Sequence, residues 1–164
     1  MTIRLMLIPA ILALVLSGCG RKEATPAGAA AEAAPAAAGP RVVEITANDA
    51  MKFSVTTIEA KAGEQLTVVL TNIGTQPKEV MGHNWVLLKA RSDAGAFSTA
   101  AAAAKDNNYI PAALKAQIIA NIDLLGPRKS GEVTFTVPGP GEYPFLCSFP
   151  AHFAVGMKGT LIVK

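Results

Sequence analysis

The feature that most constrains the fold is a series of short runs in which apolar and polar residues alternate. The clearest run is 132–137, where Val133, Phe135 and Val137 alternate with Glu and Thr. A period of two with one apolar face is typical of a half-buried β-strand. Residues 43–47 and 65–71 alternate in much the same way. Further short runs, separated by turn residues such as Gly and Pro, lie at 51–55, 85–88, 143–147 and 160–163. We therefore predict an all-β fold, a β-sandwich of seven or eight strands.

One stretch departs from this pattern. Residues 91–125 contain an alanine run at 100–104 and a segment of helix-forming composition at 111–120. Pro111 is suited to be the first residue of a helix, because its backbone angle is already helical there. We predict a helical flap at 91–125, inserted between strands.

The start of the chain has the pattern of a signal peptide at residues 1–18. Arg4 precedes an apolar run at 5–16, which is shorter than the roughly 20 residues that span a membrane. The ending Leu-Ser-Gly-Cys19 resembles the lipobox of bacterial lipoproteins, which implies that Cys19 begins the mature chain and carries lipid. In lipoproteins with this signal, a residue other than Asp after the lipidated Cys directs the protein to the outer membrane. The residue here is Gly20, so the resemblance implies an outer-membrane location. An uncleaved apolar leader with an incidental cysteine is the alternative.

Residues 19–40 have the composition of a tether. After Cys19 they consist of Ala, Gly, Pro, one Thr and a few charged residues, with no large apolar side chain to bury. Their prolines interrupt any alanine helix. We expect a folded module at 41–164, held at a membrane in the bacterial periplasmic space by the lipid on Cys19.

The charge pattern argues against a nucleic-acid binder. The chain has 15 Lys and Arg against 12 Asp and Glu, a net charge of +3. The basic residues are scattered rather than clustered, whereas nucleic-acid binding requires a basic patch.

Four residues of the module carry its chemistry. Cys147, His152 and Met157 lie within eleven residues, and His83 is the one other histidine. Two imidazoles, one thiolate and a weak axial thioether are the ligands of a mononuclear copper electron-transfer site. Cu(I) favours sulfur and low coordination, while Cu(II) favours nitrogen. A site between these preferences changes oxidation state with little rearrangement.

Other chemistries remain open for these residues. A Cys-His hydrolase would need an orienting Asn or Asp and an oxyanion hole, and the sequence has no clear motif for either. A zinc site of two His and one Cys is possible, although zinc gains little from the thioether of Met157. A copper-binding or copper-buffering lipoprotein is the alternative function. Against it, the chain lacks Met-rich and His-rich tracts.

The module resembles the azurins, a family of bacterial blue copper proteins with the cupredoxin fold. The segments that carry the resemblance are 48–53 (NDAMKF), 81–87 (MGHNWVL), 147–152 (CSFPAH) and 157–161 (MKGTL). The resemblance covers residues 41–164 and implies a Greek-key β-sandwich that binds one copper ion. It also implies equatorial ligands His83, Cys147 and His152, a weak axial ligand Met157, and a distant carbonyl of Gly82.

The same resemblance implies roles for neighbouring residues. Asn84 would hold the ligand segments together by hydrogen bonds, with Ser148 and Phe149 beside the ligands, while Trp85 and Tyr143 would be structural. An apolar docking patch would surround a partly exposed edge of His152 and consist of Met81, Phe149, Pro150, Ala151 and Val155. The implied function is one-electron transfer through His152, without enzymatic activity, to redox proteins such as c-type cytochromes or periplasmic reductases.

The chain departs from the azurin pattern at three places. Four residues, 153–156, separate His152 from Met157 where azurins have three, a spacing similar to plastocyanin and the auracyanins. Ala151 stands where azurins usually have Gly. The family's disulfide is missing, and the aligned positions are near Arg41 and Gly63.

Overall fold

The structure, a computed structural model, describes residues 39–164. The predicted signal peptide, Cys19 and most of the predicted tether lie outside the described residues. Within residues 39–164, no helix is both long and apolar enough to cross a membrane.

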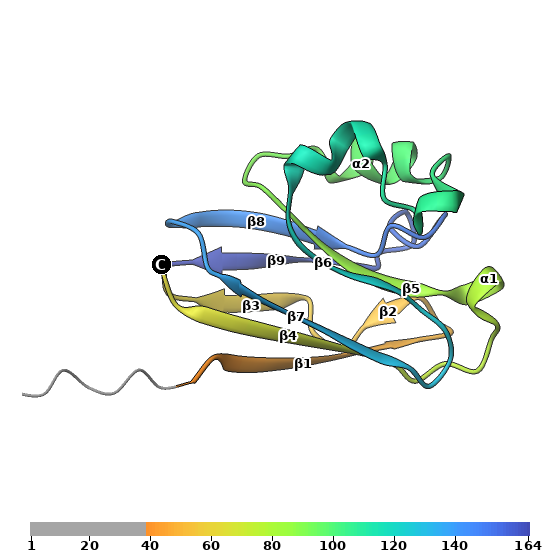
Figure 1. Cartoon of the computed structure of the whole chain (residues 1–164), viewed down its shortest axis with the longest axis horizontal. Helices are drawn as coiled ribbons and strands as arrows, with labels where there is room; N and C mark the ends of the chain where they lie inside the picture. The colour runs from red at the N-terminus through yellow and green to blue at the C-terminus, as the bar shows by residue number, and fades with distance from the viewer. Residues whose placement is uncertain (1–38) are drawn as a thin grey trace, which may run out of the picture. The chain divides into compact units, whose positions relative to one another are not determined.

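One of the two sheets has the strand order β2-β1-β4-β7. Its β1 and β4 are parallel, and its other neighbours are antiparallel. Figure 1 shows this sheet as the lower layer of the sandwich. Its strands are β1 (Arg41–Asn48), β2 (Lys52–Phe53), β4 (Gln65–Asn72) and β7 (Ser130–Thr136).

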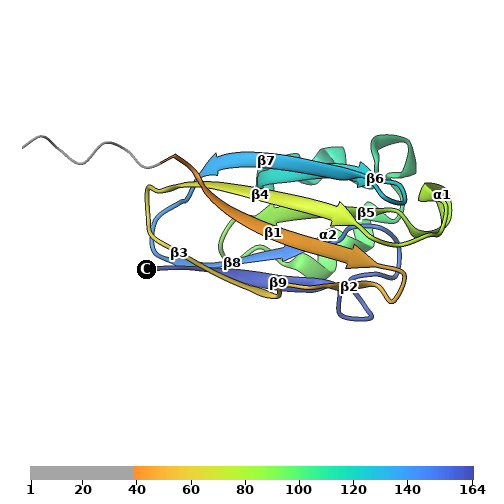
Figure 2. The same ribbon diagram turned by 90° about the horizontal axis from the view of Figure 1, so that it is seen from below.

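The second sheet has the order β3-β9-β8-β5-β6 and packs on the first, as Figure 2 shows from below. Here β3 and β9 are parallel, and the other pairs are antiparallel. Its strands are β3 (Thr57–Ala60), β5 (His83–Leu88), β6 (Ile118–Leu125), β8 (Gly141–Leu146) and β9 (Lys158–Val163). The described residues thus form nine strands in two mixed sheets, which confirms the predicted all-β sandwich, although seven or eight strands were predicted.

The core between the sheets is built on aromatic side chains. Trp85 is fully buried, and its ring centroid lies 5.4 Å from that of Phe145 and 6.2 Å from that of Phe135. Tyr143 is also buried, and its hydroxyl donates to the Gly139 carbonyl at 2.7 Å. Truncating a buried ring of this size costs about 3–5 kcal/mol, so Trp85 is structural, as predicted.

The helical flap is real but shorter than the predicted 91–125. It contains α2 (Ala94–Ala101), which begins after Asp93, and the 3-10 helices η1 (Lys105–Asn107) and η2 (Ala112–Gln117). Pro111 precedes η2 in an extended conformation and is not its first residue. The prediction for 118–125 is wrong, because this segment is β6: alternate residues Ala120, Ile122 and Leu124 are buried, and it pairs with β5.

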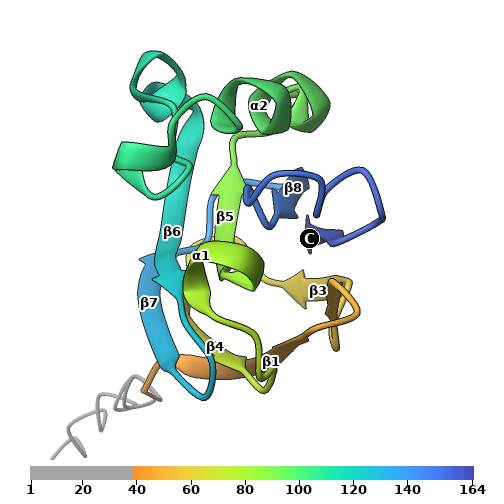
Figure 3. The same cartoon turned by 90° about the vertical axis from the view of Figure 1, so that its right-hand side faces the viewer.

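The loops at one end of the sandwich converge, and we call this the metal end. It contains the β1–β2 turn, the connection 73–82 with the short helix α1 (Lys78–Met81), the β6–β7 turn and the loop after β8. Figure 3 looks onto this end, with α1 in front and the loop between β8 and β9 beside it. The predicted ligands all come from this end.

Candidate metal centre

Three of the predicted ligands lie where a strand begins or ends, and the fourth lies in a loop. His83 is the first residue of β5 and follows Gly82, which has no room for a side chain because a Cβ there would lie 2.6 Å from the Lys78 carbonyl oxygen. Cys147 directly follows β8, and Met157 directly precedes β9. His152 lies in the loop between them. We call residues 147–157 the ligand loop.

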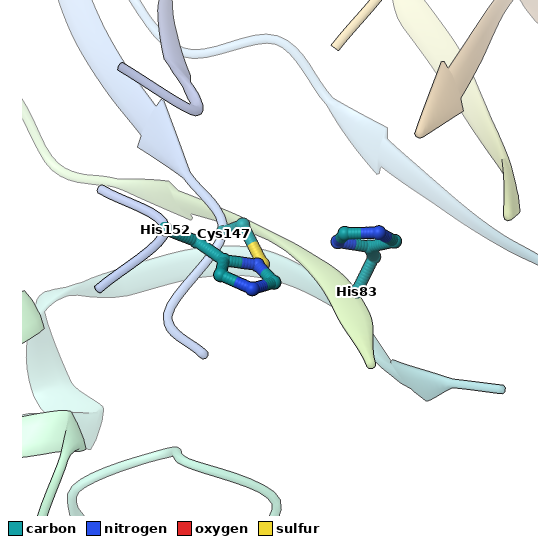
Figure 4. Close-up of side chains that lie close together, drawn as sticks. All are labelled: His83, Cys147 and His152. Atoms are coloured by element: carbon teal, nitrogen blue, oxygen red, sulfur yellow. The ribbon is translucent and has the colours of Figure 1, made fainter. Parts of the chain in front are cut away.

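The structure brings His83, Cys147 and His152 together, as Figure 4 shows. Their candidate ligand atoms all lie within 4.8 Å of one another. The Cys147 Sγ is 3.4 Å from the His152 Nδ1, and the two imidazole centroids are 5.0 Å apart. All three residues are buried, so His83 of β5 and two side chains of the ligand loop converge away from water.

Met157 is joined to the same cluster through its backbone. Its N–H donates to the His152 carbonyl at 2.9 Å, and its own carbonyl accepts from the Cys147 N–H at 3.1 Å. Its side chain is fully buried. These bonds close the ligand loop and place Met157 beside the two ligands that the loop carries.

The side chains fit a copper ion. Among the described residues, neither ring nitrogen of His83 has a hydrogen-bond partner, although both are buried. A buried polar atom without a partner costs about 1–3 kcal/mol, so such atoms indicate a missing ligand. Two imidazoles, a thiol and a thioether are the donor set that copper prefers.

The buried position of Cys147 also favours a bound cation, because only a nearby positive charge would stabilise its thiolate form. The pKa of its thiol is raised to about 12, because the effect of burial outweighs the opposing effect of the backbone N–H groups of Asn84 and Phe149. A thiolate at this position is therefore unstable unless a positive ion lies against it. Metal binding releases the thiol proton.

Both histidines are held in the neutral form that binds metals. Burial and, as the smaller cause, repulsion from the charge of a protonated His83 together lower the pKa of His152 to about 4. Burial also lowers the pKa of His83, opposed by the Asp49 carboxylate and the Asn48 carbonyl. At neutral pH both imidazoles thus have a lone pair free for a metal.

A buried hydrogen-bond network joins the ligand loop to β5 and to the flap. The Asn84 side chain donates to the Ser148 hydroxyl and accepts from the Ser148 N–H, each at 2.8 Å. The Ser148 hydroxyl donates to the Tyr109 carbonyl at 2.7 Å, and Asn84 also donates to the Asn108 carbonyl at 3.3 Å. Sequence reasoning missed the flap's part in this network, because no motif marks a backbone carbonyl as an acceptor.

The environment of His152 differs from the sequence prediction. The imidazole is only 2 % exposed, rather than partly exposed. Phe149 was expected in the surface patch, but it is buried and covers the imidazole, with ring centroids 4.7 Å apart. On its other side Phe149 meets Tyr109 of the flap, with centroids 4.9 Å apart. The flap thus helps to enclose the ligand.

The other predicted patch residues have different degrees of exposure. Ala151 and Val155 are exposed, while Met81 and Pro150 are half-buried. Val80 of α1 is 60 % exposed and was missed, because a single valine beside a motif gives no signal. Ala151 has a φ of 70°, the left-handed region in which glycine is preferred.

Two lysines that the sequence did not single out touch the ligand loop. Lys52 of β2 donates from its Nζ to the Val155 carbonyl at 2.5 Å. The Nζ of Lys158 lies 4.4 Å from the centroid of the Phe153 ring, a cation–π distance. Positive charge therefore lies against the loop on its outer surface.

Comparisons with known proteins agree with this site. A family model described as copper binding proteins of the plastocyanin/azurin family matches residues 41–164. Azurin of Pseudomonas denitrificans is 41% identical over 126 residues, which cover 74% of this chain and 97% of that protein. Azurin-1 of Alcaligenes xylosoxydans xylosoxydans is 43% identical over 123 residues, covering 73% and 94%. The crystal structure of sodium-dithionite-reduced auracyanin from Roseiflexus castenholzii matches with a TM-score of 0.68 and 34% identity, covering 75% of this chain and 96% of that one.

Proposed function

Because this chain belongs to the plastocyanin/azurin family of copper-binding proteins, we propose that it is a membrane-anchored, periplasm-facing carrier of single electrons. The family's azurins and auracyanins carry electrons and are not enzymes. The observation that supports the proposal most is the buried cluster of His83, Cys147 and His152, with Met157 at the base of the same loop. Copper bound there supplies one-electron chemistry by cycling between Cu(I) and Cu(II).

The protein's own part is to bind, orient and exclude water. His83 and His152 supply neutral imidazoles, and Cys147 supplies sulfur after it loses its proton. Met157 would hold the copper ion weakly through its thioether, and the Gly82 carbonyl would be a more distant donor. The Asn84–Ser148 hydrogen bonds fix the ligand loop against β5, and the buried Phe149 ring keeps water from His152.

Electrons enter and leave near His152, through the surface formed by Met81, Pro150, Ala151 and Val155. Val80 extends this apolar surface on α1. Small apolar interfaces bind weakly and release quickly, which suits a carrier that meets several partners. Suitable partners are c-type cytochromes and periplasmic reductases.

Residues 1–40 supply the anchor in this proposal. Residues 1–18 direct export, lipid on Cys19 holds the chain at the outer membrane, and residues 19–40 let the copper module move. If Cys19→Ala left the protein in the membrane fraction of the cells that make it, the anchor would be wrong.

The docking surface is tested with two exposed valines. Val155 lies in the ligand loop and is 45 % exposed, while Val42 of β1 is 56 % exposed and lies outside the metal end. We expect Val155→Asn to slow electron transfer with a c-type cytochrome at least fivefold in stopped-flow measurements, with an unchanged copper spectrum. Val42→Asn should have no effect. Equal rates for both variants would contradict the docking surface.

The same preparation distinguishes the carrier from a copper buffer. A carrier exchanges electrons quickly between Cu(I) and Cu(II) copies and keeps its metal against a chelator. Slow electron self-exchange combined with fast copper handover to a chelator would contradict the proposed function.

A further inference from the structure

The β1–β2 hairpin touches both parts of the metal centre. Asn48 pairs with Lys52 across the hairpin, and the Met51 N–H donates to the Asn48 carbonyl at 2.9 Å to close the turn. On one side the Asn48 carbonyl lies near enough to the His83 imidazole to raise its pKa, without making a hydrogen bond to it. On the other side Lys52 reaches the ligand loop, which carries Cys147 and His152.

This hairpin is itself held in place. The Asp49 carboxylate accepts from both the N–H and the hydroxyl of Thr75, each at 2.9 Å, which ties the turn to the connection after β4. Phe53 is buried, and its ring centroid lies 5.9 Å from that of Phe145. Lys52, the residue before Phe53, therefore extends from a fixed base.

The Lys52 ammonium lies against the part of the ligand loop that departs from the azurin pattern. It donates to the Val155 carbonyl, 103 residues away in the sequence. A Cβ placed on Gly156 would lie 3.0 Å from the same Nζ. Gly156 has a φ of 97°, where other residues are strained. The four-residue spacer 153–156 thus ends on a flexible residue beside this lysine.

The start of the spacer is held by the Phe153 ring, which packs against the buried cluster that includes Phe97. The backbone bonds of the spacer are local: they run from the Val155 N–H to the Ala151 carbonyl at 3.2 Å, from the Gly156 N–H to the Phe153 carbonyl at 3.0 Å and from the Lys158 N–H to the Gly156 carbonyl at 3.0 Å. Within residues 39–164, Lys52 is the one side chain from elsewhere that donates a hydrogen bond to the spacer. A charged donor makes a stronger hydrogen bond than a neutral one, so this bond matters for the spacer's order.

We propose that Lys52 is a positioning residue of the metal centre. Its ammonium group holds the 153–156 spacer in one conformation and so fixes Met157, the next residue, beside Cys147 and His152. The proposal rests on the copper site proposed above. Lys52 belongs to the sheet β2-β1-β4-β7, whereas the ligand loop joins two strands of the other sheet, so this contact links the spacer to the opposite layer of the sandwich.

The test compares Lys52→Met, which keeps the length of the side chain and loses the ammonium, with Lys52→Arg, which keeps charge and donors. Lys129→Met is the control, because Lys129 also lies at the metal end, is exposed and makes no side-chain hydrogen bond within the described residues. In the metal-free protein, we expect amide exchange at Val155 and Gly156 to be on the order of tenfold faster in Lys52→Met. Lys52→Arg and Lys129→Met should match the wild type.

Copper-loaded samples supply the second readout. Lys52→Met should release Cu(I) to a chelator several-fold faster, and its Cu(II) electron paramagnetic resonance spectrum should show an altered axial ligand. If both readouts match the wild type while the wild type binds copper as a blue protein, the role of Lys52 is overturned and the proposed function stands. If the wild type does not turn blue, the proposed function fails, and the exchange rates of the metal-free protein alone decide the role of Lys52.

Discussion

At the scale of single residues, the pKa of the Cys147 thiol is strongly shifted by its surroundings. The side chain is fully buried, and burial raises the pKa of its thiol from the usual 9.0 to about 12. Between these two values the unfolded chain loses the proton and the folded chain keeps it. The metal-free fold is therefore stabilised by this group below pH 9 and loses that stabilisation as the pH rises towards 12.

We predict that the free energy of unfolding of the metal-free protein falls by up to about 1.4 kcal/mol per pH unit above pH 9 because of Cys147. Urea unfolding at pH 8.5 and 10.5 measures this. The Cys147→Ser variant is the control, because it shares every other titrating group. Parallel pH dependence in the two proteins would show that Cys147 does not hold its proton.

The backbone conformation of Ala151 leads to a second prediction at the scale of single residues. Its φ of 70° is costly for alanine by about 1–2 kcal/mol. Ala151→Gly removes this cost. It also makes the unfolded chain more flexible, which lowers the free energy of unfolding by about 0.4–1 kcal/mol. We expect a net gain of about 0.5–1 kcal/mol in the free energy of unfolding, measured by urea denaturation. A loss of stability would mean that the Ala151 methyl group makes contacts worth more than the strain.

Among the elements, the contact between the ligand loop and the flap is the one that most affects the site. It runs through the Ser148 hydroxyl, which is buried and bonded to both Asn84 and Tyr109. Removing this hydroxyl leaves a buried donor and a buried acceptor without their partner. The cost of such a change is about 1–3 kcal/mol.

We therefore predict that Ser148→Ala lowers the free energy of unfolding by about 1–3 kcal/mol. Ser130→Ala is the matched control, because Ser130 makes an exposed hydrogen bond to Thr71 at 2.8 Å, and its loss should change stability by less than about 0.5 kcal/mol. Thermal or urea unfolding of both variants checks this. An equal effect in the two variants would contradict the importance of the network.

The elements also show what sequence reasoning can and cannot reach. Strands β1, β4 and β7 were predictable because their side chains alternate between core and solvent. Strands β3 and β6 alternate in the same way, but β3 is four residues long and the alanine-rich neighbours of β6 favoured a helix. The metal ligands were predictable from residue type and spacing. The contacts of Lys52, Tyr109 and Asn108 were not, because they depend on side-chain reach and backbone carbonyls.

At the scale of the whole molecule, the site and the start of the module lie at opposite ends of β1. Near Arg41 and Gly63, where the resemblance to azurins implies a disulfide and this chain has no cysteine, Arg41 forms an ion pair with Glu64 at 2.9 Å and donates to the Glu59 carbonyl at 2.7 Å. These bonds join the same two segments, although an exposed ion pair contributes only about 0–1 kcal/mol. This ion pair therefore contributes little to stability compared with the buried core of the sandwich.

The central claim is that this sandwich binds copper through Cys147, and titration of the metal-free protein with Cu(II) tests it most directly. We predict an intense blue thiolate-to-copper absorption that saturates at one copper per chain and is lost in Cys147→Ser. A colourless protein that binds zinc in preference to copper would contradict the account.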